Sequence, residues 1–459
     1  MARATWYRLD NVGKFYAAQA GGTRQTIFRI AATMADEVDP ASLQRALDGA
    51  VALFPGFNVC LRSGLFWHYL VPAPEPPRVE PETLPVCFNL HTGPKSVLFR
   101  ITYYQRRINV EVSHIISDGR GTLEFLKALL ALYVAERYGA DAAPAPYAGD
   151  EASKTEDSFS EHYDRAAAGR DGAPKVFHLA GWKTDVDPAY LELHYSADAV
   201  HAAAKTCGAT VTGYLIAAVI CALRREMPPA ERGRAIHMDV PVDLRSLFGS
   251  TTLRNFFGLA YVTYVPGDTD EPLSAIAAQV QEQLATGTEP ASLKRRMMRM
   301  VKLEKNPIVR AVPLFLKDAA LDFAAWRATR EVTCTVSSLG RVALDAAVAP
   351  YVEGISAMTS PAGLNFILCT CGDDLCIGVS SRFVSLRAAR HLADVLAAEG
   401  LSGRANINKD AAQVDASLRE SALKERLASI AATWQSRAID HPRREQGIGS
   451  GDSRKGGRS

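Results

Sequence analysis

Residues 108–121 read INVEVSHIISDGRG. They join an alternating apolar stretch to a histidine, three spacer residues, an aspartate and a glycine. Because successive strand side chains point to opposite faces, His114 shares the inward face of the predicted strand with the two valines before it. The Asp118-Gly pair predicts a turn, and Thr122 is expected to cap the apolar helix that follows. A strand, a turn and a helix in this order are typical of a mixed α/β fold.

His114 is the candidate general base. A neutral imidazole accepts protons near neutral pH, since its unperturbed pKa is ~6.5. Asp118 follows four residues later on the tight turn and can help to orient the loop. The alternative is a buried histidine that only satisfies a backbone group, and three fixed positions alone do not decide between the two.

Length and composition indicate an ordinary soluble protein. The 459 residues exceed one usual core and favour two domains, and 47% of them are hydrophobic and 22% charged. The formal net charge is +2, and residues 441–459 alone carry five basic and two acidic side chains. The rest of the chain is therefore nearly neutral, which disfavours a nucleic-acid partner.

The eight cysteines form no CxxC pair, so neither a disulfide framework nor a metal site is expected. Cys369 and Cys371 lie two apart and are expected to pack on one face of a strand. There is no apolar leader and no run of about 18 uncharged apolar residues. We therefore expect a cytoplasmic protein.

The pattern of elements predicts an α/β (α+β) sandwich in two similar halves. The polar turn, strand and helix of residues 106–132 recur in residues 374–396, where the histidine and the Asp-Gly pair are absent. One active site per chain is expected, where the halves meet. The simplest dinucleotide, phosphate-loop and serine-hydrolase motifs are missing. The expected parts are a first domain at 1–145, a linker at 146–175, a second domain at 176–405, and a C-terminal helix with a disordered basic tail at 406–459.

A second informative region is residues 236–265, IHMDVPVDLRSLFGSTTLRNFFGLAYVTYV. A predicted strand delivers Arg245, a candidate bidentate partner for Asp118 that would hold the loop carrying His114. A surface arginine at a turn is an equally good interpretation from spacing alone. After a polar turn, residues 255–258 open another apolar strand.

Several segments together resemble the CoA-dependent acyltransferase superfamily. They are WYRLDNVGKFY at 6–16, FPGFNVCLRSGLFWHYLV at 54–71, SHIISDG at 113–119, PVDLRSLFGSTTLRNFFG at 241–258, VSSLG at 336–340 and PAGLNFILCTCGDDLCIGVSSRF at 361–383. That superfamily includes chloramphenicol acetyltransferase, plant-type and polyketide-associated acyltransferases and peptide-synthetase condensation domains. Within it the chain is most similar to alcohol O-acetyltransferases.

The resemblance implies two chloramphenicol acetyltransferase-like domains that form a pseudo-dimer around a central channel. It also implies an acyl-CoA-dependent O-acyltransferase that uses acyl-CoA, in particular acetyl-CoA, and a small alcohol or amine acceptor. The implied catalytic residues are His114, Asp118 and Gly119, and the implied structural support comes from Arg245, Asn255 and Gly258. Relatives often have Ser-Asn before Leu-Gly where this chain has Ser337 and Ser338, so these two are only weak candidates for contacting the co-substrate.

Two other functions stay open at this stage. A condensation-type transferase would take its acyl group from a carrier protein, and a binding protein would keep the fold without catalysis. The joint presence of His114, Asp118 and Arg245 disfavours the binding protein. The duplicated halves already supply an interface, so we expect a monomer.

The last distinctive segments are basic or apolar helices. For LKRRMMRMVKLEK at 293–305, a packed helix with a solvated basic face is favoured over contact with CoA phosphates or with an anionic membrane. The next segment, 307–326, is apolar but interrupted by charges, so it should form a core or channel-covering helix and not a membrane anchor. A further helix is expected to continue to about residue 438.

Overall fold

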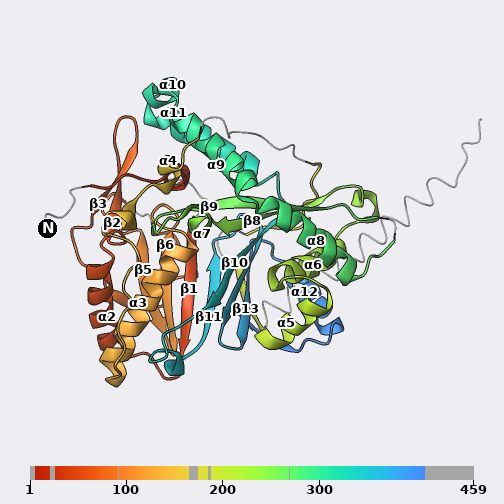
Figure 1. Cartoon of the computed structure of the whole chain (residues 1–459), viewed down its shortest axis with the longest axis horizontal. Coiled ribbons are helices and arrows are strands. Elements are labelled where there is room, and N and C mark those ends of the chain that lie inside the picture. Colours follow the sequence, from red (N-terminus) through yellow and green to blue (C-terminus); the bar gives the residue numbers. More distant parts are fainter. Residues whose placement is uncertain are drawn as a thin grey trace, which may run out of the picture. The chain divides into compact units, whose positions relative to one another are not determined.

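The computed structural model describes residues 6–20, 26–90, 93–164, 174–184, 188–267 and 269–408. Two mixed sheets organise this part of the chain, and helices cover them (Figure 1). The expected α/β sandwich is therefore confirmed. The predicted C-terminal helix lies outside the described residues. The strand β14 (Gly403–Ile407) precedes it and is described.

The five-stranded sheet holds the strand that leads to His114. Its order is β11 (Val352–Thr359), β1 (Ile27–Met34), β6 (Arg107–Ser113), β5 (Phe99–Tyr104) and β4 (Val79–Pro81). One face packs on α2 (Pro40–Leu53) and α3 (Gly119–Tyr138), where Val110, Leu126 and Leu130 are fully buried. A small hairpin of β2 (Val59–Ser63) and β3 (His68–Pro72) stands beside this sheet.

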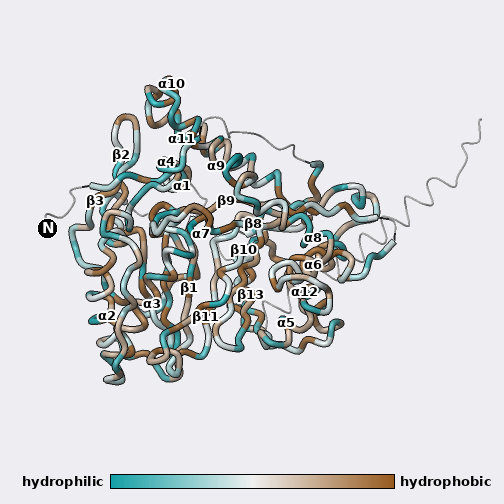
Figure 2. Tube along the Cα trace, in the orientation of Figure 1, coloured by the Kyte–Doolittle hydropathy of each residue, from teal (hydrophilic) through white to brown (hydrophobic). Residues whose placement is uncertain are grey.

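The seven-stranded sheet belongs to the second half. Its order is β14, β7 (Ala189–Ser196), β13 (Asp374–Ser381), β12 (Leu364–Cys371), β10 (Cys334–Val342), β8 (Ile236–Asp243) and β9 (Phe257–Tyr264). Figure 2 shows hydrophobic stretches along β13 and along helix α6. The helices of this half are α5 (Ala197–Thr206), α6 (Val211–Arg224), α7 (Arg245–Phe248), α8 (Leu273–Gly287), α9 (Pro290–Glu304), α10 (Pro307–Ala311), α11 (Leu314–Ala328) and α12 (Arg387–Ala398).

The two sheets meet at β11 and β13. Although β11 comes late in the chain, it pairs with β1 along its whole length. At the junction Gly378 lies so close to β11 that a Cβ atom there would be 1.9 Å from the Ala357 carbonyl oxygen. Only glycine permits this approach. The first sheet is thus completed by a strand from the second half, which packs tightly on β13.

Three expectations need correction. Asp118, and not Thr122, is the N-cap of α3, so that helix begins at Gly119. The segment expected to be a core or channel-covering helix forms α10 and α11, and in α11 only Ala325 is buried, so a core helix was wrong. The segment 146–175, expected to be a linker, contains a short helix, α4 (Ser158–Glu161), among its described residues. In contrast, the apolar face of α9 is buried, as expected for a packed helix with a basic outer face.

No single helix among the described residues is long and apolar enough to cross a membrane. Helices α5 and α6 meet the requirements of length and apolarity only when they are counted together, and the chain bends between them. In the same residues no group of three or more His, Cys, Asp or Glu side chains is placed to hold a metal ion.

Candidate active site

His114 follows the last residue of β6, in the turn that leads to α3. Its ring lies between two aromatic rings, stacked on Tyr16 with centroids 4.9 Å apart and tilted against Phe28 at 4.4 Å. Although these rings surround it, the side chain keeps partial solvent exposure. The position at the end of a strand and partly open to solvent is one that a substrate can reach.

Burial determines the ionisation of His114. It lowers the pKa of the imidazole to about 4, although Asp118 and Asn255 act in the opposite direction. The ring is therefore neutral at physiological pH. Its Nδ1 atom is buried and has no hydrogen-bond partner among the described residues.

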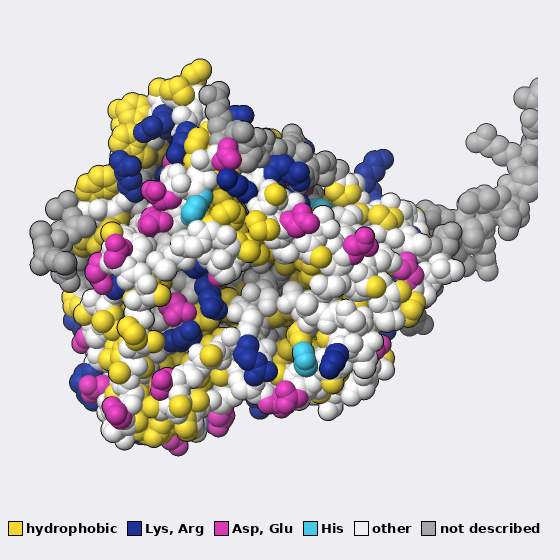
Figure 3. Space-filling view, in the orientation of Figure 1, with side chains coloured by type: hydrophobic (Ala, Val, Ile, Leu, Met, Phe, Trp, Pro, Cys, Tyr) yellow, Lys and Arg dark blue, Asp and Glu magenta, His cyan; other side chains and the backbone are white. Residues whose placement is uncertain are grey.

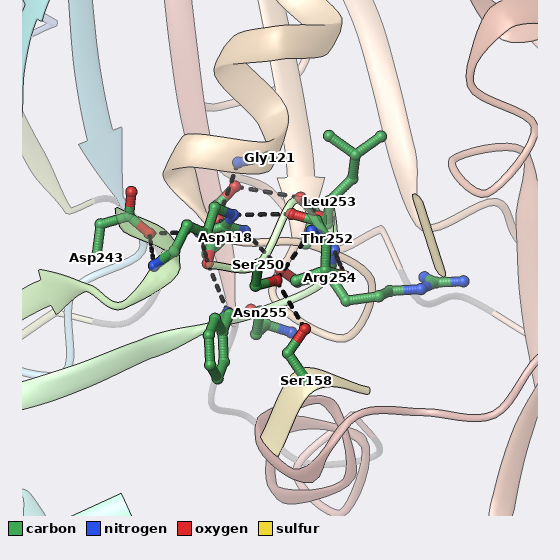
Figure 4. A network of polar contacts seen from close by, with 12 residues as sticks. Asp118, Gly121, Ser158, Asp243, Ser250, Thr252, Leu253, Arg254 and Asn255 are labelled. Atoms are coloured by element: carbon green, nitrogen blue, oxygen red, sulfur yellow. Dashed lines mark hydrogen bonds and ion pairs between the residues drawn. The ribbon is translucent and has the colours of Figure 1, made fainter. Parts of the chain in front are cut away.

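The carboxylate of Asp118 binds Arg245. The Nη1 and Nη2 atoms of Arg245 each donate to one carboxylate oxygen of Asp118 at 3.0 Å, so the expected bidentate pair is present. The carboxylate also accepts from the backbone N–H groups of Gly121 and Phe256 at 2.9 and 2.8 Å. Both side chains are largely buried, and Figure 4 shows this network around Asp118.

Arg245 uses every donor of its guanidinium. Besides Asp118, it donates to the carbonyl oxygens of Thr252 and Arg254 and to the carboxylate of Asp243. Burial opposes its charge, but Asp118 and Asp243 together outweigh this effect, so the pKa of Arg245 is raised above its usual value. The pair thus fixes the start of α3 against the loop between α7 and β9.

Asn255 connects this loop directly to His114. Its Nδ2 atom donates to the backbone carbonyl of His114 at 2.8 Å and to the carboxylate of Asp10 at 3.0 Å. Asp10 in turn caps α1 (Asn11–Ala17), the helix that carries Tyr16 over the imidazole. Asn255 therefore positions both the backbone of His114 and the helix that covers its ring.

The two predicted glycines differ in their surroundings. A Cβ at Gly119 would lie 2.7 Å from the side chain of Leu339 on β10, so the motif glycine allows the start of α3 to approach the second half. Gly258 lies in β9, where a Cβ would be 3.0 Å from Leu293 and 3.2 Å from Leu244. Both glycines therefore serve close packing between segments that are far apart in the sequence.

Ser337 and Ser338 lie in β10 and are partly exposed. The Oγ atom of Ser338 accepts from the backbone N–H of Gly340 at 3.2 Å. Leu339, the next residue, lies at an irregularity in the pairing of β10 with β12 and reaches the turn at Gly119. The strand thus borders the turn after His114, and a role of the two serines in binding a co-substrate stays a prediction.

Sequence reasoning gave no role to Asp239, in the middle of β8. The strand register places Asp239 beside Thr335. Glu192 lies on the same face of the sheet, and from there it reaches the first half and binds Arg107. Burial raises the pKa of Asp239 to about 6, and its Oδ1 atom is buried without a hydrogen-bond partner in the described part of the chain. Burial raises the pKa of Tyr16 and the charge of Asp239 adds to this effect, so this carboxylate lies near the ring that covers His114.

Tyr16 and Asp239 left different signals in the sequence. The start of a short apolar helix at Asp10-Asn11 can be inferred from the sequence, but no nearby residues indicate that this helix covers His114. Asp239 interrupts the apolar run IHMDV, and a charge in the middle of a central strand is itself unusual. The sequence therefore does carry a signal for Asp239.

The surface formed by the described residues has at least two hollows. Figure 3 shows the face in view hollowed near its centre. A separate cavity of about 380 Å³ is lined by Arg8 and by residues between 150 and 161, several of them acidic, and none of the predicted site residues lines it. The central channel implied by the family resemblance stays a prediction.

Comparisons with known proteins agree with this architecture. The sequence profile of a family described as phthiocerol/phthiodiolone dimycocerosyl transferase C-terminus matches residues 185–319, less than a third of the chain. That range contains Arg245, Asn255 and Gly258 but not His114. A comparison with curated protein sequences found no match.

Solved structures match over most of the chain. The first condensation domain of the calcium-dependent antibiotic synthetase has a TM-score of 0.58 and 18% identity, over 86% of this chain and 97% of that one. Polyketide synthase associated protein 5 from Mycobacterium tuberculosis has a TM-score of 0.56 and 13% identity, over 85% and 97%. A mutant starter condensation domain of rhizomide synthetase, in complex with C8-CoA and Leu-SNAC, has a TM-score of 0.56 and 13% identity, over 86% and 95%. The chain therefore has the condensation-domain fold, with two chloramphenicol acetyltransferase-like halves.

Proposed function

We propose that this protein is an acyltransferase that moves an acyl group from a CoA thioester to the hydroxyl group of a small acceptor. The observation that carries the proposal is the neutral, partly exposed imidazole of His114 at the end of β6. The similarity to condensation domains and to a polyketide-associated protein supports a reaction of acyl thioesters. The resemblance to alcohol O-acetyltransferases favours a short acyl group.

The chemistry requires little beyond a base and correct placement. A thioester is already an activated acyl donor, so the acceptor hydroxyl must mainly lose its proton as its oxygen attacks the carbonyl carbon. We assign proton acceptance to Nε2 of His114, because Nδ1 is buried. The C–S bond then breaks and free CoA leaves as the thiol, with the proton that His114 had taken.

Asp118 has a supporting role in this proposal. Its carboxylate is occupied by Arg245 and by two backbone N–H groups, so it holds the turn and takes no proton from the imidazole. Asn255 holds the backbone of His114 through its carbonyl. The catalytic group is thus one side chain on a rigid support.

The test compares His114→Ala with the parent protein in an assay of free thiol release. The purified full chain is incubated with acetyl-CoA or a longer acyl-CoA and with a panel of alcohols and amines. We expect release that depends on an acceptor, and a loss of at least ~10²-fold in the variant, because a positioned base contributes ~10² to 10⁴ in rate. CoA binding, followed by calorimetry, should be retained.

His201→Ala is the matched control, since His201 is exposed on α5. It should behave as the parent does. Undiminished turnover by His114→Ala would reject the assigned base. If the parent releases thiol only from an acyl carrier protein, the donor is not free CoA, and if it releases none from any donor, the proposed activity is wrong.

A further inference from the structure

Helices α10 and α11 expose large apolar side chains on one part of the surface. Exposed fractions are 78% for Ile308, 70% for Phe315 and 62% for Phe323. A surface helix normally buries an apolar stripe, yet Ala325 is the one buried residue of the 15 in α11. We call this surface the apolar crest; it comprises Leu65, Trp67, Leu303, Ile308, Phe315, Leu316, Phe323 and Trp326.

The apolar crest is fixed to the body of the protein. The backbone N–H of Leu314 donates to the carbonyl of Leu65 at 2.9 Å, and Lys317 Nζ donates to the carbonyl of Phe66 at 2.9 Å. His68 and Asp318 add a contact at 3.1 Å. The hairpin of β2 and β3 thus joins α11 in one surface, and yellow side chains gather there at the top of Figure 3.

The segment that carries most of the apolar crest is rich in positive charge. Residues 294–331 contain ten Lys and Arg against four Asp and Glu, a net charge of +6 in a chain whose total is +2. The remainder of the chain therefore carries −4. Exposed basic side chains near the apolar crest are Arg299, Lys302, Lys305, Arg310, Arg327 and Arg330.

Composition and charge identify the occupant. Aromatic and aliphatic side chains beside Lys and Arg are typical of helices that lie in a membrane interface. A second copy of this chain would bring the same +6 region against itself in a two-fold dimer, and like charges oppose that contact. Residues 441–459 are also basic, so charge disfavours them as a cover. Since α11 has 15 residues and about 20 are needed to span a bilayer, it would lie along the surface.

We propose that the apolar crest docks on the surface of an anionic lipid bilayer, with α11 in the plane of the interface. Phe315, Phe323 and Trp326 enter the boundary between headgroups and acyl chains, and the surrounding cations contact the headgroups. This docking does not depend on the proposed acyl transfer.

A structural route leads from the apolar crest to His114. Glu304, at the end of α9, accepts a hydrogen bond from Asn11 at 2.6 Å and pairs with Lys14, both on α1. The same helix carries Tyr16, which stacks on the imidazole. The helix that covers the candidate base is therefore anchored on the helix that leads to the bilayer surface.

The experiment is co-sedimentation of the full chain with vesicles. We use phosphatidylglycerol and phosphatidylcholine in equal parts, and phosphatidylcholine alone. We expect binding to the anionic vesicles that is at least about tenfold tighter than to the neutral ones and that weakens in high salt. The double variant Phe315→Ser, Phe323→Ser should bind at least about tenfold more weakly, with unchanged circular dichroism because both side chains are exposed.

The matched control is Phe88→Ser with Val265→Ser, two exposed apolar side chains outside the apolar crest. It should bind anionic vesicles as the parent does. No binding by the parent, or equal binding by the crest variant, would overturn the proposal. Self-association in analytical ultracentrifugation that the crest variant abolishes would also overturn it, in favour of a second copy. None of these outcomes depends on thiol release, so this inference and the proposed function fail separately.

Discussion

The imidazole of His114 is neutral because neighbouring side chains bury it, and its protonation state determines how activity depends on pH. Tyr16 and Phe28 remove water from the ring, and burial lowers its pKa to about 4. The charge of Asp118 acts in the opposite direction without overcoming burial, and its carboxylate is bound to Arg245. The arrangement keeps the base unprotonated over a wide pH range.

We therefore expect kcat/KM to stay level from about pH 8 to about pH 5 and to fall as the pH approaches 4. The sign follows from the role, because protonation of the imidazole removes the base, and kcat/KM reports ionisations of the free enzyme. The measurement is initial thiol release across pH, within the range in which the circular dichroism spectrum is unchanged.

A midpoint near 6.5 would contradict this prediction, because it would indicate a solvated imidazole. Asp239 provides the control, since burial raises its pKa to about 6. If a shallow step near pH 6 is present, Asp239→Asn should remove that step and leave the fall near pH 4 in place.

For the residues around His114, the sequence was informative about residue types but not about which residues lie next to each other in space. The spacing of His114, Asp118 and Gly119 identified the turn, and the end of the predicted strand in 236–265 identified Arg245 as a candidate partner of Asp118. The contact of Asn255 with the His114 carbonyl joins residues 141 positions apart. No local pattern encodes such a contact, because it depends on how two distant loops pack.

The start of α3 illustrates how one residue serves two elements. Asp118 caps the helix through the N–H of Gly121 and binds Arg245 at the start of α7. Sequence analysis placed the cap at Thr122 because two glycines precede it, and glycine usually disfavours helix. Here a Cβ at Gly121 would lie 2.2 Å from the Leu253 carbonyl oxygen, so close packing decides the residue.

Asp118→Asn should lower the free energy of unfolding by about 2 to 3 kcal/mol, because it leaves the buried Arg245 charge without its main partner. The amide would also present donor hydrogens to groups that are themselves donors. Chemical denaturation monitored by circular dichroism measures the change. Asp243→Asn is the control, since Asp243 also binds Arg245 but is more exposed, and it should change stability by less than about 1 kcal/mol. Equal stability of the Asp118 variant and the parent would show that the pair does not hold the turn.

Elements with strong local patterns can be read from the sequence, and those defined by distant partners cannot. The helix at Pro40–Leu53 follows from Asp39 as cap and proline in the first turn. In contrast, β11 was missed, because it is buried on both faces and shows no clear alternation. Its partner, β1, lies more than 300 residues away, so pairing and not propensity makes it a strand.

On the scale of the whole molecule, the two sheets are joined by charge as well as by β11. Arg107 on β6 donates to both carboxylate oxygens of Glu192 on β7, at 2.8 and 2.6 Å. Burial opposes the Glu192 charge, but hydrogen bonds from His194 and Arg107 hold its pKa below the usual value. The pair links the half that carries His114 to the half that lacks an equivalent histidine.

Arg107→Ala should therefore lower the free energy of unfolding by about 2 to 3 kcal/mol, because Glu192 keeps a buried charge with fewer partners. Arg106→Ala is a matched control one residue away. Arg106 pairs with Glu353, but both side chains are well exposed, so a change within about 1 kcal/mol is expected. Denaturant titrations of the three proteins provide the comparison, and equal values for the two variants would mean that the link between the sheets contributes no more than a surface pair.

The position of β11 constrains how this protein can be divided. A fragment that stops before residue 352 would leave the N–H and C=O groups of β1 without partners along one whole side. Such an open edge invites pairing with any extended chain nearby, which is the usual start of aggregation. The histidine-bearing half consequently depends on a segment that is translated late: until residues 352–359 have left the ribosome, β1, the strand beside β6, has no permanent neighbour on that side.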